Sequence, residues 1–222
     1  MPRLFIILAA SACCVPSATA GENWPQWRGP HQNGVAEGES FPVEWDREKN
    51  VVWRVDLPGP GGSTPIVWDD RIFITLTADG KNQLHCYSMA GELIWKQSVG
   101  NEFPGKHKKA TGANPSACTD GERVYCYFKN GSLAAFTMDG EKLWDTNPHE
   151  LFGEVNHETL WWDLGTSPVL TKNALVVTCM QSGPSYLAAF DRQTGKVLWK
   201  EDRKLPAPRE AAQSYATPTV LE

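Results

Sequence analysis

The chain has 222 residues, a formal net charge of −5 and 41% hydrophobic residues, which allows one domain with a sizeable core. Its only short basic run, residues 106–109, is better explained as a solvated loop than as a nucleic-acid-binding surface. The apolar run near the N-terminus is shorter than the ~20 residues of a membrane-spanning helix.

Residues 1–20 have the order of features of a secretory signal peptide. Arg3 gives the positive start, Leu4 to Ala12 are mostly apolar, and Ala18 to Ala20 are small. We expect cleavage after Ala20 and export to the periplasm or the medium. A lipid anchor on Cys13 and an ordinary buried helix are the alternatives. Residues 21–50 then form an N-terminal extension.

From residue 51 onwards one unit recurs, which predicts a repeat domain over 51–222. The three full units lie at about 63–100, 114–148 and 166–203, and a fourth begins at 214–222. Each opens near a proline, and each full unit closes on a tryptophan. The prolines are Pro65, Pro115, Pro168 and Pro218, and the tryptophans are Trp95, Trp144 and Trp199.

Each unit divides into four short strands. In the second, Arg123 to Phe128 is rich in aromatic and β-branched residues, and Asn130-Gly131 is a strong hairpin signal. Asp120-Gly121 and Asp139-Gly140 mark its other turns. Corresponding turns in the other units are Asp69-Asp70, Ala90-Gly91, Lys172-Asn173 and Thr194-Gly195. No stretch after the leader has a convincing helical period.

Four antiparallel strands repeated about every fifty residues predict an all-β β-propeller, with three blades and one opening strand present. Stacked solenoid sheets or a sandwich are the alternative. Because an unclosed ring leaves blade faces and edges bare, we expect this to be the N-terminal part of a longer protein, or one of several chains in a ring. The lone strand 50–59, which carries Trp53, would close the last blade.

The segment Ala189 to Trp199 resembles the tryptophan-docking motif of the pyrroloquinoline quinone (PQQ)-like propeller repeat. Asp191, Thr194 and Gly195 fill its turn, and the other two units fit more loosely. The beginning of the extension, NWPQWRGPHQNGVAEG, looks like exported bacterial proteins of this class. The class includes the outer-membrane assembly propeller lipoprotein and the quinoprotein dehydrogenases.

The motif itself favours a structural role. Trp95, Trp144 and Trp199 are expected to wedge against the next blade, with each indole N–H reaching a carbonyl. Asp191 and Thr194 can bond local backbone groups, and glycine supplies the unusual backbone angle of the turn.

In quinoprotein dehydrogenases the quinone binds on the central axis, away from these tryptophans. The resemblance therefore implies PQQ and calcium only for the redox members. Their set of ligands does not map onto this chain, and the adjacent Cys13 and Cys14 lie in the leader. No catalytic, cofactor-binding or metal-binding residue is assigned.

Two connectors, 102–114 and 147–165, are candidates for binding, because propeller strands are committed to packing. Their candidate residues are His107, His149, His157, Glu158, Trp161, Trp162 and Asp163. A loop packed by its own aromatic residues is the alternative. Cys86, Cys118, Cys126 and Cys179 permit two disulfides or four buried thiols.

These features favour an exported, non-catalytic binding or scaffold module. Its partners would be other proteins or missing blades of the same propeller. The alternatives are a PQQ- and calcium-dependent oxidoreductase, and a carbohydrate- or peptide-binding module of a larger secreted protein.

Overall fold

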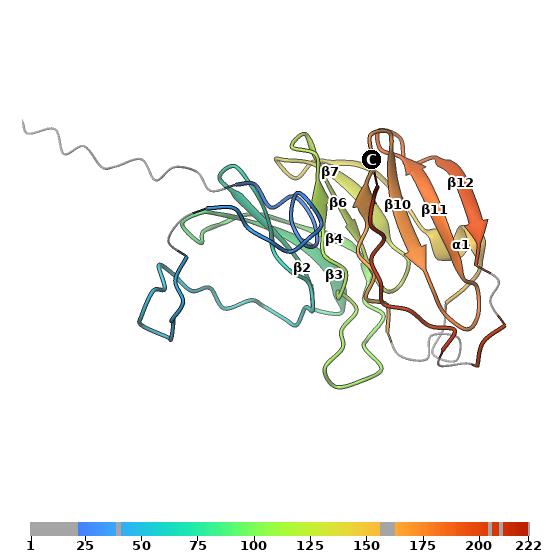
Figure 1. Cartoon of the computed structure of the whole chain (residues 1–222), viewed down its shortest axis with the longest axis horizontal. Coiled ribbons are helices and arrows are strands. Elements are labelled where there is room, and N and C mark those ends of the chain that lie inside the picture. The colour runs from blue at the N-terminus through green and yellow to red at the C-terminus, as the bar shows by residue number, and fades with distance from the viewer. Residues whose placement is uncertain (1–21, 39–40, 156–162, 204–205, 209–210, 222) are drawn as a thin grey trace, which may run out of the picture.

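The computed structural model describes residues 22–38, 41–155, 163–203, 206–208 and 211–221. It contains three four-stranded antiparallel sheets, which stand side by side as consecutive blades (Figure 1). The predicted all-β fold with four-stranded blades is confirmed. The predicted leader lies outside the described residues.

Within each blade the strands follow one another in sequence order. Blade 1 contains β1 (Ile66–Trp68), β2 (Arg71–Ala78), β3 (Lys81–Ser88) and β4 (Leu93–Asn101). Blade 2 contains β5 (Cys118–Thr119), β6 (Arg123–Tyr127), β7 (Leu133–Thr137) and β8 (Lys142–Thr146). Blade 3 contains β9 (Val169–Leu170), β10 (Ala174–Cys179), β11 (Tyr186–Asp191) and β12 (Val197–Asp202).

The tight turns lie where the turn residues predict them. Gly91, Gly140 and Gly195 follow the third strands of the three blades and have φ of 81°, 86° and 68°. Positive φ is cheap only for glycine, so each glycine allows the chain to reverse at once.

One short helix, α1 (Pro148–Phe152), was not expected. The Oδ1 atom of Asn147 caps it by accepting a hydrogen bond of 2.9 Å from the His149 backbone N–H. A helix of one turn is too short to show a helical period in the sequence, which explains why periodicity missed it.

The structure corrects one part of the repeat register. The backbone N–H groups of Thr64, Ser116 and Ser167 each donate to the side-chain hydroxyl of a residue in the next repeat. The equivalent positions are therefore Thr64, Ser116, Ser167 and Thr217. Pro65, Pro168 and Pro218 follow these positions, but Pro115 precedes its own. Equating Pro115 with the other prolines was wrong.

The hydrophobic core lies between the blades rather than within any one of them. One buried cluster joins blades 1 and 2 and includes Phe73, Val124 and Phe136. A second joins blades 2 and 3 and includes Tyr127 and Phe190. Because each sheet is thin, its apolar face is removed from water only by its neighbour.

The four cysteines outside the leader are free and buried. They are therefore four buried thiols and do not form two disulfides. Burial raises the pKa of the Cys86 thiol to about 11 and that of Cys179 to about 12. These cysteines therefore serve as packing residues, and their thiols have low reactivity.

The N-terminal extension runs along the inner strands. Trp24 forms a two-way backbone bridge with Val67 of β1, and Thr119 of β5 donates to the Pro25 carbonyl. The side chain of Gln32 accepts from the backbone N–H of Val220 in the fourth repeat. The extension therefore contacts blade 1, blade 2 and the start of the fourth repeat. Within the described part of the chain, no helix has the length and apolar character to span a membrane.

Candidate functional site

Two of the closing tryptophans, Trp95 and Trp144, reach across to the following blade. The Nε1 atom of Trp95 in blade 1 donates to the Met138 carbonyl of blade 2 at 2.9 Å. The Nε1 atom of Trp144 in blade 2 donates to the Arg192 carbonyl of blade 3 at 3.0 Å. Each bond satisfies the polar atom of a ring that is otherwise packed.

Each of these rings lies on a turn glycine of the following blade. A Cβ atom added to Gly140 would lie 2.7 Å from the Trp95 ring, and one added to Gly195 would lie 2.6 Å from the Trp144 ring. The glycine therefore has two roles, because it provides the positive φ and leaves room for the indole.

Trp53 makes the same contact ahead of blade 1. Its Nε1 atom donates to the Met89 carbonyl at 2.7 Å, and a Cβ atom on Gly91 would lie 2.9 Å from its ring. At the other end, Trp199 is 44% exposed, whereas Trp144 is 9% exposed. The described residues include no blade that covers Trp199.

The side chain of Asp191 organises the turn before Trp199. Its Oδ1 atom accepts from the backbone N–H of Thr194 and from the Thr194 hydroxyl, both at 2.8 Å. The hydroxyl bond, followed by the backbone bonds, lowers the pKa of Asp191 below its ordinary value. Asp191 and Thr194 are thus bonded within their own turn.

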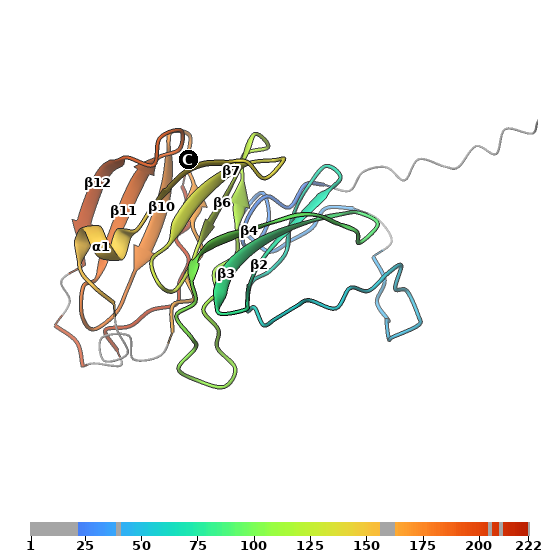
Figure 2. The same ribbon diagram turned by 180° about the vertical axis from the view of Figure 1, so that it is seen from behind.

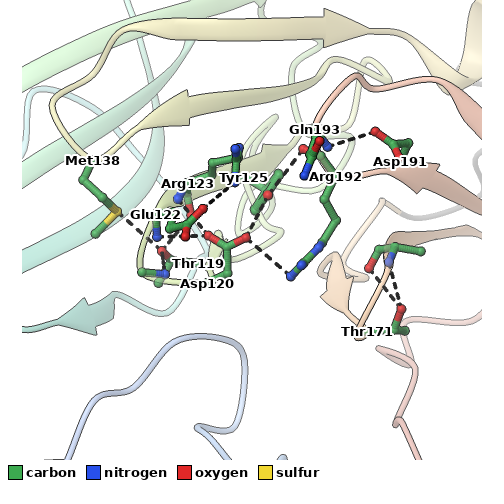
Figure 3. Close-up of polar contacts among 12 residues, drawn as sticks. Thr119, Asp120, Glu122, Arg123, Tyr125, Met138, Thr171, Asp191, Arg192 and Gln193 are labelled. Carbon is green, nitrogen blue, oxygen red and sulfur yellow. Dashed lines mark hydrogen bonds and ion pairs between the residues drawn. The ribbon is translucent and has the colours of Figure 1, made fainter.

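A polar network joins blades 2 and 3 near the same turn (Figure 3). The Tyr125 hydroxyl donates to Asp120 at 3.1 Å, and the Arg192 guanidinium pairs with Asp120 at 3.4 Å. Arg71 pairs with Asp139 at 2.9 Å between blades 1 and 2. Side chains at this end of the blades hold neighbouring blades together.

A cleft of about 520 Å³ opens on the inner strands at the other end of the blades. Its lining includes Trp27 of the extension, Tyr215, Gly62 and Gly165. The connector 102–114, which projects from one end of the sheets (Figure 1, Figure 2), places His107 and Lys109 at its rim. We refer to this space as the axial cleft.

Two equivalent serines line the axial cleft, and both are nearly inaccessible to solvent. Ser116 is 1% exposed and Ser167 is 3% exposed. The Ser116 Oγ atom accepts from the Thr64 N–H, and the Ser167 Oγ atom accepts from the Ser116 N–H, both at 2.9 Å. Their positions come from the repeat, because the inner strand of each blade bonds to that of the next.

A buried ion pair stands behind the cleft wall. The Lys129 ammonium is fully buried and pairs with Asp163, which borders the cleft. Lys129 also donates to the Pro104 carbonyl at 2.6 Å and lies 4.4 Å from the centre of the Phe103 ring. The backbone N–H of Lys106 donates to the same carboxylate. Both connectors are therefore tied to blade 2 by one carboxylate.

The binding-loop candidates fall into three groups. His107 and Asp163 border the axial cleft. His149 is instead buried in α1, 3.0 Å from the Tyr127 hydroxyl, and burial lowers its pKa to about 4. His157, Glu158, Trp161 and Trp162 lie outside the described residues.

Comparison with known proteins identifies the family. Residues 43–220 match the protein family described as outer membrane protein assembly factor BamB. The chain belongs to this family. No curated protein matches it significantly.

Two solved dehydrogenase structures share the fold of this BamB-family chain. The quinohemoprotein alcohol dehydrogenase from Comamonas testosteroni has a TM-score of 0.56 and 17% identity, over 81% of this chain and 27% of its own. A europium-containing methanol dehydrogenase has a TM-score of 0.56 and 15% identity, over 83% and 32%. BamB from Moraxella catarrhalis has a TM-score of 0.47 and 20% identity, over 68% and 38%. The chain thus spans about a third or less of the two dehydrogenases.

The axial cleft of this BamB-family chain does not fit a calcium-bound quinone. Calcium needs several free oxygen ligands. The Asp163 carboxylate is already paired with Lys129, and the Asn114 Oδ1 atom accepts from the backbone and hydroxyl of Thr111. Among the described residues, no group of three His, Cys, Asp or Glu side chains is placed to hold a metal ion.

Sequence reasoning missed several residues of the cleft. Ser116 and Ser167 could have been found from the hydroxyl side chain at one position of every repeat. The burial of Lys129 could not be predicted in this way, because a lysine directly before an Asn-Gly turn is expected to be exposed to solvent. Trp27 and Tyr215 lie far apart in the sequence, and only the tertiary structure places both on one cleft.

Proposed function

We propose that this chain is a non-catalytic binding or scaffold module of an exported propeller, and that the face around the axial cleft receives a protein partner. Membership of a family described as an outer membrane protein assembly factor supports a scaffold role. Export rests on the signal-like order of residues 1–20.

The observation that carries the proposal is the pairing of Asp163 with Lys129. A calcium site needs several oxygen ligands, and a general base needs a carboxylate that can take up a proton from its target. Here the carboxylate on the cleft wall accepts from a buried ammonium and from a backbone N–H. The Asp163 carboxylate therefore holds the two connectors in place. The exposed residues of the connectors remain available to contact a partner.

A reconstitution assay separates this proposal from a quinoprotein oxidoreductase. The chain from residue 21 onwards is incubated with PQQ and calcium, and dye-linked oxidation of methanol, ethanol and glucose is followed. We expect no dye reduction above the protein-free background, while a quinoprotein dehydrogenase run in parallel gives turnover. Dye reduction that requires both PQQ and this chain would refute a non-catalytic role.

Site-specific photocrosslinking in the producing organism tests the binding face. The crosslinking residue replaces Lys108, which is exposed in connector 102–114, or Lys172, which is exposed in the turn between β9 and β10. We expect one discrete protein adduct from position 108 and none from position 172. Equal adducts from both positions, or none from either, would remove the support for a partner at this face.

A further inference from the structure

The axial cleft contains hydrogen-bond donors that the described residues leave unused. The hydroxyls of Ser116 and Ser167 each accept one backbone N–H, and among the described residues neither finds an acceptor. A buried hydroxyl without an acceptor loses a hydrogen bond that water would have given it. The cleft is therefore prepared for a ligand that brings oxygen acceptors.

Two aromatic side chains give the same cleft its apolar surface. Trp27 is 40% exposed and Tyr215 is 50% exposed, although both border a concave space. Large exposed aromatic rings beside a few polar groups are typical of ligand-binding clefts. They favour a ligand that carries a flat or apolar side chain next to its oxygen acceptors.

The rim of the cleft is positively charged. Lys109 is exposed at the rim, and its ammonium has no carboxylate partner among the described residues. The nearby carboxylate of Asp163 is engaged by the buried Lys129. A chain with a net charge of −5 thus presents a local cation where a ligand would enter.

The N-terminal extension and connector 102–114 both line the cleft. The extension is bonded to β1 and β5 through Trp24 and Pro25, and it contributes Trp27 to the lining. The connector contributes His107 and Lys109. A ligand in the cleft would therefore have an aromatic ring and a cation within the same lining.

We propose that the axial cleft binds an extended acidic peptide segment of the protein partner, with an aromatic side chain next to its carboxylate. The carboxylate pairs with the Lys109 ammonium, the aromatic side chain packs on Trp27 and Tyr215, and peptide carbonyls accept from Ser116 and Ser167. A single extended peptide can supply the carboxylate, the aromatic side chain and the carbonyl acceptors. This inference rests on the proposed function, because it names the chemistry of the partner at the same face.

Isothermal titration calorimetry of the chain from residue 21 onwards provides the test. The probe is the peptide acetyl-Glu-Phe-Glu-Phe-Glu-amide, and its matched control has glutamine in place of every glutamate. We expect the acidic peptide to bind at least tenfold more tightly than the control, and higher salt to reduce this difference.

A matched pair of variants assigns the binding to the cleft. Lys109→Ala removes the rim cation, whereas Lys108→Ala removes an exposed lysine that does not border the cleft. Both side chains are exposed, so neither change should affect folding. We expect Lys109→Ala to weaken binding of the acidic peptide about tenfold and Lys108→Ala to weaken it less than twofold.

Three results would overturn the inference. They are no binding of the acidic peptide, equal binding of the glutamine peptide, and equal effects of the two lysine variants. Digalacturonate is tested in parallel, and binding of this acidic sugar without binding of the peptide would also overturn it. Photocrosslinks from position 108 that persist in any of these cases would leave the proposed function standing.

Discussion

Trp144 lies directly on Gly195, and this contact joins blade 2 to blade 3. The indole N–H donates to the Arg192 carbonyl at 3.0 Å, and a Cβ atom on Gly195 would lie 2.6 Å from the ring. Trp95 and Trp53 repeat the arrangement on Gly140 and Gly91. The same two-residue contact therefore sets the spacing of successive blades.

Trp144→Ala should lower the free energy of unfolding by about 3–5 kcal/mol, because it opens a cavity in the junction of two blades. Trp199→Ala, at the equivalent position, should lower it by about 1 kcal/mol or less, since Trp199 is 44% exposed and no described blade covers it. Urea unfolding of both variants gives the comparison. Equal losses would show that the contact with the next blade contributes little.

Gly195→Ala should be more destabilising than Gly80→Ala, although the two glycines have φ of 68° and 69°. Both variants place a side chain in the left-handed region, which costs about 1–2 kcal/mol. Only Gly195 is covered by a tryptophan ring, whereas a Cβ atom on Gly80 would meet nothing within 4 Å.

The difference between these two variants isolates the steric part of the cost. Overpacking against the Trp144 ring should add about 1–3 kcal/mol for Gly195→Ala in urea unfolding. If the two variants lost the same free energy, the backbone conformation alone would explain the glycine.

Lys129→Met should destabilise the chain by about 3–5 kcal/mol, because it leaves the Asp163 carboxylate buried without its cation. The double variant Lys129→Met with Asp163→Leu should recover most of this loss, since a buried ion pair can often be replaced by apolar side chains. Thermal and urea unfolding of the two single variants and the double variant measure the coupling. An additive double variant would contradict the pairing.

The stability of the chain should fall as the pH is lowered from about 6.5 to about 4. Burial lowers the pKa of His149 to about 4, so the unfolded state takes up the proton near pH 6.5 while the folded state resists it. The expected loss across this window is about 3 kcal/mol for one such histidine. Burial, with a smaller effect of Lys96, also lowers the pKa of His85 to about 4.

His149→Gln tests this assignment. The variant removes one of the two histidines that are buried in the described part of the chain, so the fall in unfolding free energy between pH 7 and pH 4.5 should shrink by roughly half. Urea unfolding at several pH values gives the slope for both proteins. An unchanged slope would mean that His149 takes up no proton on unfolding in this window.

The blade architecture could be predicted because its determinants are local. The turn pairs Asn130-Gly131 and Asp139-Gly140 specify where strands reverse, and alternating apolar residues between them specify the strands. The closing tryptophans were recognisable for the same reason. The position of Pro115 within its repeat could not be predicted. It depends on which hydroxyl of the next blade accepts a hydrogen bond from each inner strand.

The sequence by itself determined the class of fold, the repeat unit and the family, because these depend on short-range patterns that recur along the chain. Only the tertiary structure decided the site. Trp27, Lys109, Ser116, Ser167 and Tyr215 meet at one cleft because the extension and the inner strands of successive blades converge there. The burial of Lys129 against Asp163 was likewise decided by the packing of two connectors on blade 2. Such contacts join residues distant in sequence, and no local pattern records them.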